Sequence, residues 1–278
     1  MTTQIATLRL TTGELFVALN EMNLGSGMLG ATSSLAQVPD TELSAFLVDG
    51  RARLLARGLL RPDEYGKTVV APGLRHVLVR SVRPQAAIWL MRASTDAKGP
   101  AQTFIALDRE GGVAYRPDAD AALHDFIPIA ESGALAQLAT EIVMTQAMVD
   151  AQPGGARPRS WMLPLSLITA VTERAAEGDA GDDPTGLMGA GMSAADAAEL
   201  FEACRSTETR GALTGYATGA QGLSLVWMAR AGVMWTVRMD GDSGMALVRR
   251  CDLAAAAQQA AALAVNMAGR VWRATVKQ

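Results

Sequence analysis

The feature that most limits how this chain can fold is a Pro- and Gly-rich segment near its middle. The same order of predicted elements occurs on both sides of it. Residues 150–159 (DAQPGGARPR) hold two prolines and a Gly-Gly pair and nothing to bury, so they predict a linker. On each side, the apolar periodicity predicts helices, then strands with a hairpin turn, then a last helix. We therefore predict a single α+β domain over 1–278, made of two similar halves, 10–149 and 160–275.

The first half carries clear start and turn signals. Thr11 and Glu14 form a capping-box pair that opens an apolar helix. Pro72 suits the first turn of a later helix, which ends before Pro84. The sequence DREGG at 108–112 predicts a hairpin turn. The other expected elements are a helix over 41–57, strands over 86–91, 103–107 and 113–116, and a helix over 131–149.

The second half follows a similar order. A helix is predicted over 160–176, and a glycine-rich, acidic stretch over 177–191 predicts a long loop. Ser193 caps the next helix, and an alanine-rich helix over 253–267 closes the half. Strands are predicted between these helices over 212–217, 223–228, 233–238 and 245–248.

Short matches between the halves support an internal duplication. Gly112-Val113 with Tyr115 corresponds to Gly232-Val233 with Trp235. Each half offers a small antiparallel sheet with helices on one side, and each sheet alone would expose an edge strand. Joining the two sheets around a pseudo-two-fold axis hides those edges, so we predict one central antiparallel sheet.

The composition excludes several classes of protein. The chain is 49% hydrophobic and 19% charged, which is incompatible with intrinsic disorder. Two cysteines, Cys204 and Cys251, cannot form a disulfide framework, and two histidines, His76 and His124, are poor material for a metal site. A net charge of −3 disfavours nucleic acid. We expect no membrane span, no secretory signal and a cytoplasmic location.

Three glycine-containing motifs resemble nucleotide-binding loops, but the residues and elements around them do not fit such a loop. Residues 25–30 fit the dinucleotide fingerprint but follow a helix, and 189–194 follow an acidic loop. Gly66-Lys67-Thr68 lacks the front glycine of a P-loop, since Arg61 stands there. Neither histidine has a nucleophile partner. We therefore predict a protein that is not an enzyme and has no catalytic, cofactor-binding or metal-binding residues.

Fourteen methionines are about twice the usual share, and such side chains suit binding of a helical partner. Met188 and Met192, in the glycine-rich loop, are the best candidates for exposure, whereas Met228 and Met234 are at least as consistent with core packing. The predicted partner-binding residues are Met188, Met192, Trp227, Met228, Met234 and Trp235.

The sequence of residues 10–120 carries a family resemblance. The segment LARGLL at 55–60, the strand Ile88-Trp89-Leu90 and the hairpin FIALDREGGVAYRP at 104–117 resemble the EspG family, the cytosolic chaperones of actinobacterial type VII secretion. The resemblance implies a quasi-two-fold α+β fold with a central antiparallel sheet and flanking helical bundles. It also implies a partner, a small helical secreted protein of the PE/PPE kind, whose aggregation-prone tip is kept soluble until export.

We therefore predict a non-enzymatic, EspG-like chaperone that captures an apolar helical surface by the hydrophobic effect. Two alternatives remain open. The arginines at 51, 53, 57 and 61, followed by a helix and a hairpin, also fit a winged-helix DNA-binding regulator. A pocket between the halves would fit a protein that binds a small molecule.

Overall fold

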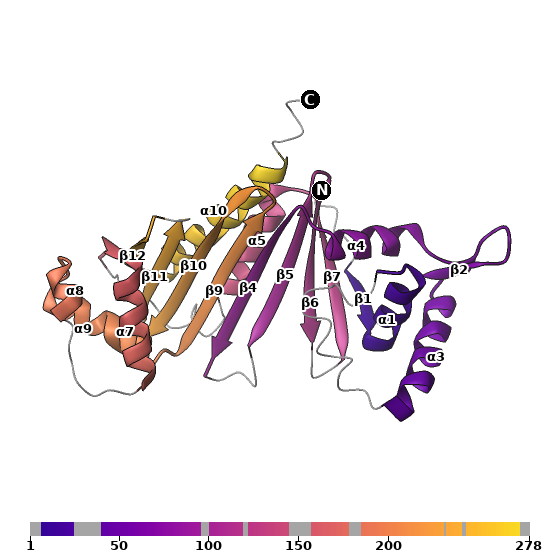
Figure 1. Cartoon of the computed structure of the whole chain (residues 1–278), viewed down its shortest axis with the longest axis horizontal. Coiled ribbons are helices and arrows are strands. Elements are labelled where there is room, and N and C mark those ends of the chain that lie inside the picture. The colour runs from indigo at the N-terminus through magenta and orange to yellow at the C-terminus, as the bar shows by residue number, and fades with distance from the viewer. Residues whose placement is uncertain are drawn as a thin grey trace. The chain divides into compact units, whose positions relative to one another are not determined.

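The computed structural model describes residues 7–24, 40–95, 100–118, 122–144, 157–177, 185–230, 232–240 and 243–272. The glycine motif at 25–30, most of the linker 150–159 and residues 178–184 of the expected loop lie outside these ranges. The chain has a mixed α and β fold with a large antiparallel sheet of ten strands and a separate two-stranded sheet (Figure 1), which confirms the predicted fold class. Two compact units are described in turn: 1–87 with 102–131 and 271–278, and 88–101 with 132–270.

The first unit contains four strands of the large sheet, in the order β1-β7-β6-β5. These strands are β1 (Leu8–Thr11), β7 (Leu123–Ile129), β6 (Gly111–Asp118) and β5 (Ala101–Asp108). The helices are α1 (Thr12–Glu21), α3 (Asp40–Ala56) and α4 (Pro72–Val82), and the two-stranded sheet consists of β2 (Leu60–Pro62) and β3 (Thr68–Val70).

Local signals fix the start of α1. The Thr11 hydroxyl accepts the Glu14 backbone N–H at 3.3 Å, and the Glu14 carboxylate accepts the Thr11 N–H at 2.8 Å, which is the predicted capping box. Glu14 also accepts a hydrogen bond from Arg57 at 2.7 Å. One core joins α1 and α4 to the sheet through buried side chains that include Leu15, Leu78 and Phe126.

The second unit contains the other six strands, in the order β4-β9-β10-β11-β12-β8. These strands are β4 (Ala86–Ser94), β9 (Thr209–Ala217), β10 (Ala220–Arg230), β11 (Val233–Asp240), β12 (Met245–Cys251) and β8 (Arg159–Pro164). The helices are α5 (Ser132–Val143), α7 (Leu165–Glu177), α8 (Thr185–Gly189), α9 (Ala194–Arg205) and α10 (Leu253–Trp272).

The two faces of this sheet are covered by different helices. On one face lies α10: the Thr236 hydroxyl donates to Gln259 at 3.1 Å, and a Cβ at Gly215 would lie 2.9 Å from Met267. Helices α7 and α9 cover the other face over β8, β12, β11 and part of β10. There Trp235 and Met228, like Leu200 of α9, are buried in one core. Figure 1 shows α7, α8 and α9 grouped beside β11 and β12.

The structure corrects two local predictions and contains four strands that were not predicted. The expected helix over 160–176 begins only at Leu165, because residues 159–164 form β8, with Trp161 opposite Val248 in β12. The stretch expected to be a loop contains the short helix α8. The strands β1 and β7 and the small sheet β2–β3 were not predicted at all. All four strands predicted for the second half are present.

The order of elements is similar on the two sides of the linker. A strand, helices, four consecutive strands and a helix run from β8 to α10. The same order runs from β1 to α5, except that β2 and β3 are inserted between the helices α3 and α4. Within the sheet, β1 pairs with β7 and β8 pairs with β12 in the same antiparallel sense. The duplication of an ancestral half stays a prediction. Of the helices described, none is long and apolar enough to cross a membrane.

Candidate partner-binding surface

The six residues predicted from sequence to bind a partner lie in very different environments. Met188, on α8, exposes 43% of its surface. Met192 exposes only 4%, so the expectation that it is exposed was wrong: it packs into the core between α8 and α9. The remaining four are buried as well: Trp227, Met228, Met234 and Trp235. Binding of a partner through these residues stays a prediction, and Met188 alone of the six presents a large surface.

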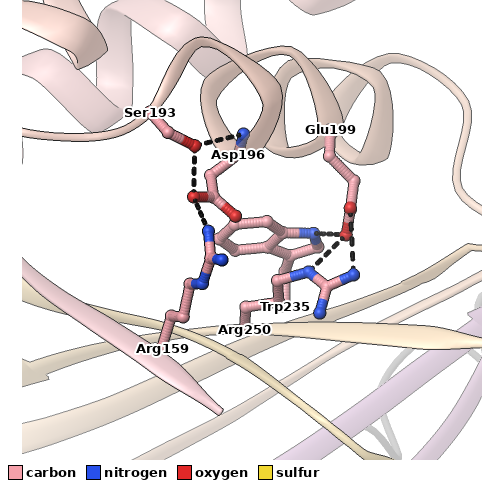
Figure 2. A network of polar contacts seen from close by, with 6 residues as sticks. All are labelled: Arg159, Ser193, Asp196, Glu199, Trp235 and Arg250. Carbon is pink, nitrogen blue, oxygen red and sulfur yellow. Dashed lines mark hydrogen bonds and ion pairs between the residues drawn. The ribbon is translucent and has the colours of Figure 1, made fainter. Parts of the chain in front are cut away.

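Trp235 instead ties the sheet to α9 (Figure 2). Its indole Nε1 donates to Glu199 Oε1 at 3.2 Å. The same carboxylate receives Arg250 Nε at 3.0 Å and Arg250 Nη2 at 3.1 Å, a bidentate ion pair. The ring of Trp235 also stacks on Trp161 with centroids 5.8 Å apart. Glu199 therefore joins α9 to two neighbouring strands at once.

A second set of contacts fixes the start of α9, also drawn in Figure 2. The Ser193 hydroxyl accepts the Asp196 N–H at 3.2 Å and donates to the Asp196 carboxylate at 2.5 Å, as its predicted capping role requires. The buried Asp196 carboxylate also pairs with Arg159 of β8 at 2.5 Å. Helix α9 is thus attached to the β8–β12–β11 side of the sheet.

The same sheet face is exposed over β9 and β4. Along β9, Leu213 and its alternate neighbours are buried, whereas Thr214 is exposed and Tyr216 exposes 50% of its surface. On β4, Trp89 exposes 42% between the buried Ile88 and Leu90. The register places Ser224 of β10 beside Thr214, whereas Val226, beside Ala212, packs against the core under α7 and α9. We call this surface the open strip; it consists of Trp89, Ala212, Thr214, Tyr216 and Ser224.

At one end of the open strip lies a polar cavity of about 640 Å³, which we call the arginine pocket. Arg205 and Arg230 each contact Glu202 at 2.5 Å, so two guanidinium groups share one carboxylate. The hydrogen bond from Arg230 is the largest cause of a lowered pKa at Glu202, which keeps this carboxylate charged. The lining residues are Ala93, Ser94, Thr95, Cys204, Arg205, Ser206, Thr207, Glu208, Arg210 and Arg230.

Burial makes both cysteine thiols and the imidazole of His124 less reactive. Burial raises the pKa of the Cys204 thiol, in the arginine pocket, and of the Cys251 thiol, each to about 11. His124 is buried between the Tyr115 hydroxyl at 2.8 Å and the Thr12 hydroxyl at 3.0 Å, and burial lowers its pKa. No group of three or more His, Cys, Asp or Glu that could hold a metal ion occurs within the described ranges.

Comparison with known proteins gives a match in fold. No protein-family model matches the chain. A search of curated proteins finds no significant match. Among solved structures, the chain is similar to the Mycobacterium tuberculosis type VII secretion system chaperone EspG5 in its complex with a PE25–PPE41 dimer. The TM-score is 0.63 at 13% sequence identity, over 96% of each chain. This chain therefore has an EspG-like fold.

Sequence reasoning missed the residues that form the exposed surface. Trp89 was predicted only as a residue of a strand, and Tyr216 and Arg210 were not among the predicted partner-binding residues. The alternation of polar and apolar residues along β9 was a usable signal, because Arg210, Thr214 and Tyr216 lie on one face. The sequence contains no local signal for which part of that face the helices cover.

Proposed function

We propose that the chain is a non-enzymatic, cytosolic, chaperone-like protein of type VII secretion that binds an apolar helical partner of the PE/PPE kind. The observation that carries the proposal is the fold similarity to EspG5, a chaperone whose structure was solved with a PE25–PPE41 dimer, over 96% of both chains. The resemblance of residues 10–120 to the EspG family supports the same function.

The open strip is the surface we assign to the partner. Trp89 and Tyr216 are large, partly exposed aromatic side chains on adjacent strands, and such residues commonly dominate binding energy. The neighbouring side chains are small or weakly polar, so an apolar helix can lie across them. Because Asp196 and Glu199 attach α9 over β8, β12 and β11, and Glu202 attaches its C-terminal end to Arg230 of β10, the described part of α9 leaves Thr214 and Tyr216 of β9 exposed.

Co-expression with PE/PPE-like pairs from the same genome tests this function. The expected result is a soluble complex of defined stoichiometry with at least one pair, measured by size-exclusion chromatography with light scattering. A pair that is insoluble alone and soluble with this chain shows the chaperone effect directly. If every PE/PPE-like pair of the genome stays unbound by a folded chain, the proposed function is wrong.

A matched pair of variants tests the surface. Tyr216→Glu places a charge in the open strip and should weaken the complex by at least tenfold, because a carboxylate would have to be desolvated on binding. Met162→Glu is the control: Met162 exposes 58% of its surface, and its register with Leu247 puts it on the opposite sheet face. Equal effects of the two substitutions would contradict the assignment to the open strip.

A further inference from the structure

The arginine pocket has the chemistry of an anion-binding site. Its lining brings together three guanidinium groups, from Arg205, Arg210 and Arg230, and the hydroxyl groups of Ser94, Ser206 and Thr207. Guanidinium groups and hydroxyls are the donors that hold carboxylates and phosphates in proteins. The cavity is large enough to admit the end of a side chain from a bound molecule, at about 640 Å³.

The charges in and beside the pocket leave a positive excess. Glu202 lies between Arg205 and Arg230, and the exposed Glu208 is part of the lining. Three cations therefore face two carboxylates. The C-terminal end of α9 adds a partial negative charge of about half a unit, which the cations still exceed. Arg210 is exposed, and its side chain makes no hydrogen bond or ion pair with any residue that the structure describes. Its guanidinium is therefore available to a ligand.

The pocket opens on the same sheet face as the open strip. Arg210 and Tyr216 are both even-numbered residues of β9 and so point to one side of the sheet. Arg230 shares that side, because the register pairs Met228 with Arg210 and Arg230 lies two residues further along β10. Cys204 of the pocket contacts Met228 on this face at 3.7 Å between the two sulfur atoms. One ligand can therefore occupy both sites.

We propose that the arginine pocket binds a carboxylate side chain of the same helical partner whose apolar surface occupies the open strip. This inference rests on the proposed function for the identity of the partner. Arg210 and Tyr216 are six residues apart along β9, or about 20 Å. A helix that runs along β9 covers this distance in about 13 residues. The partner therefore carries an Asp or Glu about 13 residues from its apolar contact with Tyr216.

A small carboxylate tests the pocket without any partner. Acetate replaces chloride at constant ionic strength while thermal unfolding of the full chain is followed. The expected result is a rise in the unfolding midpoint with acetate concentration, which Arg210→Gln abolishes. The matched control is Arg174→Gln, which removes the same charge from an exposed position on α7. A rise unchanged in R210Q, or no rise in the wild type, overturns the proposal.

Inorganic phosphate forms the second arm of this experiment. A carboxylate site responds to acetate, also where the more highly charged phosphate stabilises the chain further. Stabilisation by phosphate alone would identify the pocket as a site for a free phosphate ion and would overturn its assignment to a carboxylate of the partner.

Charge exchange tests the pairing in the complex. Arg210→Glu should weaken the complex with a PE/PPE-type partner by about tenfold or more, because like charges then face each other. Arginine placed at the matching acidic position of the partner should restore most of that loss. Wild-type affinity in R210E, or no rescue by any Asp or Glu replaced in turn, overturns the proposal. If no partner binds the wild type, the proposed function fails, and the acetate experiment still decides the anion site.

Discussion

Gly50 of α3 packs against the backbone of Gly13 of α1. A Cβ built on Gly50 would lie 2.5 Å from the Gly13 carbonyl carbon and 2.6 Å from its oxygen, well inside van der Waals contact. At this point the backbones of the two helices are in direct contact, with no side chain between them. Position 50 therefore requires glycine because there is no room for a Cβ atom, and not because of its backbone angles.

Gly50→Ala should lower the free energy of unfolding by about 1–3 kcal/mol, because the helices must separate to admit one methyl group. Urea denaturation followed by circular dichroism measures the change. Gly133→Ala in α5 is the matched control, since a Cβ there meets no atom within 4 Å. The control should change stability by less than about 1 kcal/mol. Similar losses for both variants would contradict the close packing of α1 on α3.

The ion pair between Glu199 and Arg250 should contribute a measurable coupling energy to the stability of the fold. The side chains expose 38% and 19% of their surface, so solvent screens the pair and we expect a coupling of only about 1 kcal/mol. A double-mutant cycle with Glu199→Gln and Arg250→Gln measures it. Arg53 and Asp49 on α3, exposed by 56% and 61%, provide a control pair. A coupling no larger than that of the control pair would show that the pair of Glu199 and Arg250 does not hold α9 on the sheet.

The sequence predicted those helices and turns that are determined by residues close together in the chain. The Thr11–Glu14 capping box, Pro72 in the first turn of α4 and the hairpin turn between β5 and β6 depend on residues a few positions apart. The strand β8 was misread as helix because its partner β12 lies about 85 residues later in the chain. Without that partner, the apolar residues Trp161 and Leu163 fit the start of the helix that follows.

Exposure in the candidate site could not be predicted, because it depends on where the helices attach. Trp235 and Tyr216 are both aromatic residues on strands, with 1% and 50% of their surface exposed. The difference arises because Glu199 and Asp196 attach α9 over β11 and not over β9. These attachments join residues as far apart as 51 positions. Methionine content alone therefore selected three buried residues, Met192, Met228 and Met234, beside the exposed Met188.

The buried His124 predicts a loss of stability in mild acid. Burial is the main cause of its lowered pKa, and the nearby Asp125 opposes this shift more weakly. In the unfolded chain the imidazole takes up a proton near its ordinary pKa of 6.5, whereas in the folded chain it does so only at lower pH. Stability is therefore fully present above about pH 6.5 and falls below it, by up to about 1.4 kcal/mol per pH unit.

Urea denaturation between pH 8 and pH 5 measures this dependence. His124→Asn removes the titrating group, so the variant should be less stable at pH 8 but should lose less stability towards pH 5 than the wild type. The carboxylate of Asp125 does not interfere in this range, because its pair with Arg9 lowers its pKa below 3.8. The same slope in both proteins would show that His124 does not titrate on unfolding.

Cys204 should react slowly with thiol reagents although it lines a pocket. Desolvation raises its pKa from 9.0 to about 11, so the thiolate fraction at pH 8 is about 100-fold lower than in the unfolded chain. Reaction of the Cys251→Ser variant with Ellman's reagent isolates Cys204 and should be about 100-fold slower when native than in guanidinium chloride. The arginines of the pocket give the opposite expectation, because cations stabilise a thiolate. A native rate equal to the unfolded rate would therefore mean that the electrostatic effect of Arg205 and Arg230 offsets the cost of burial at this sulfur.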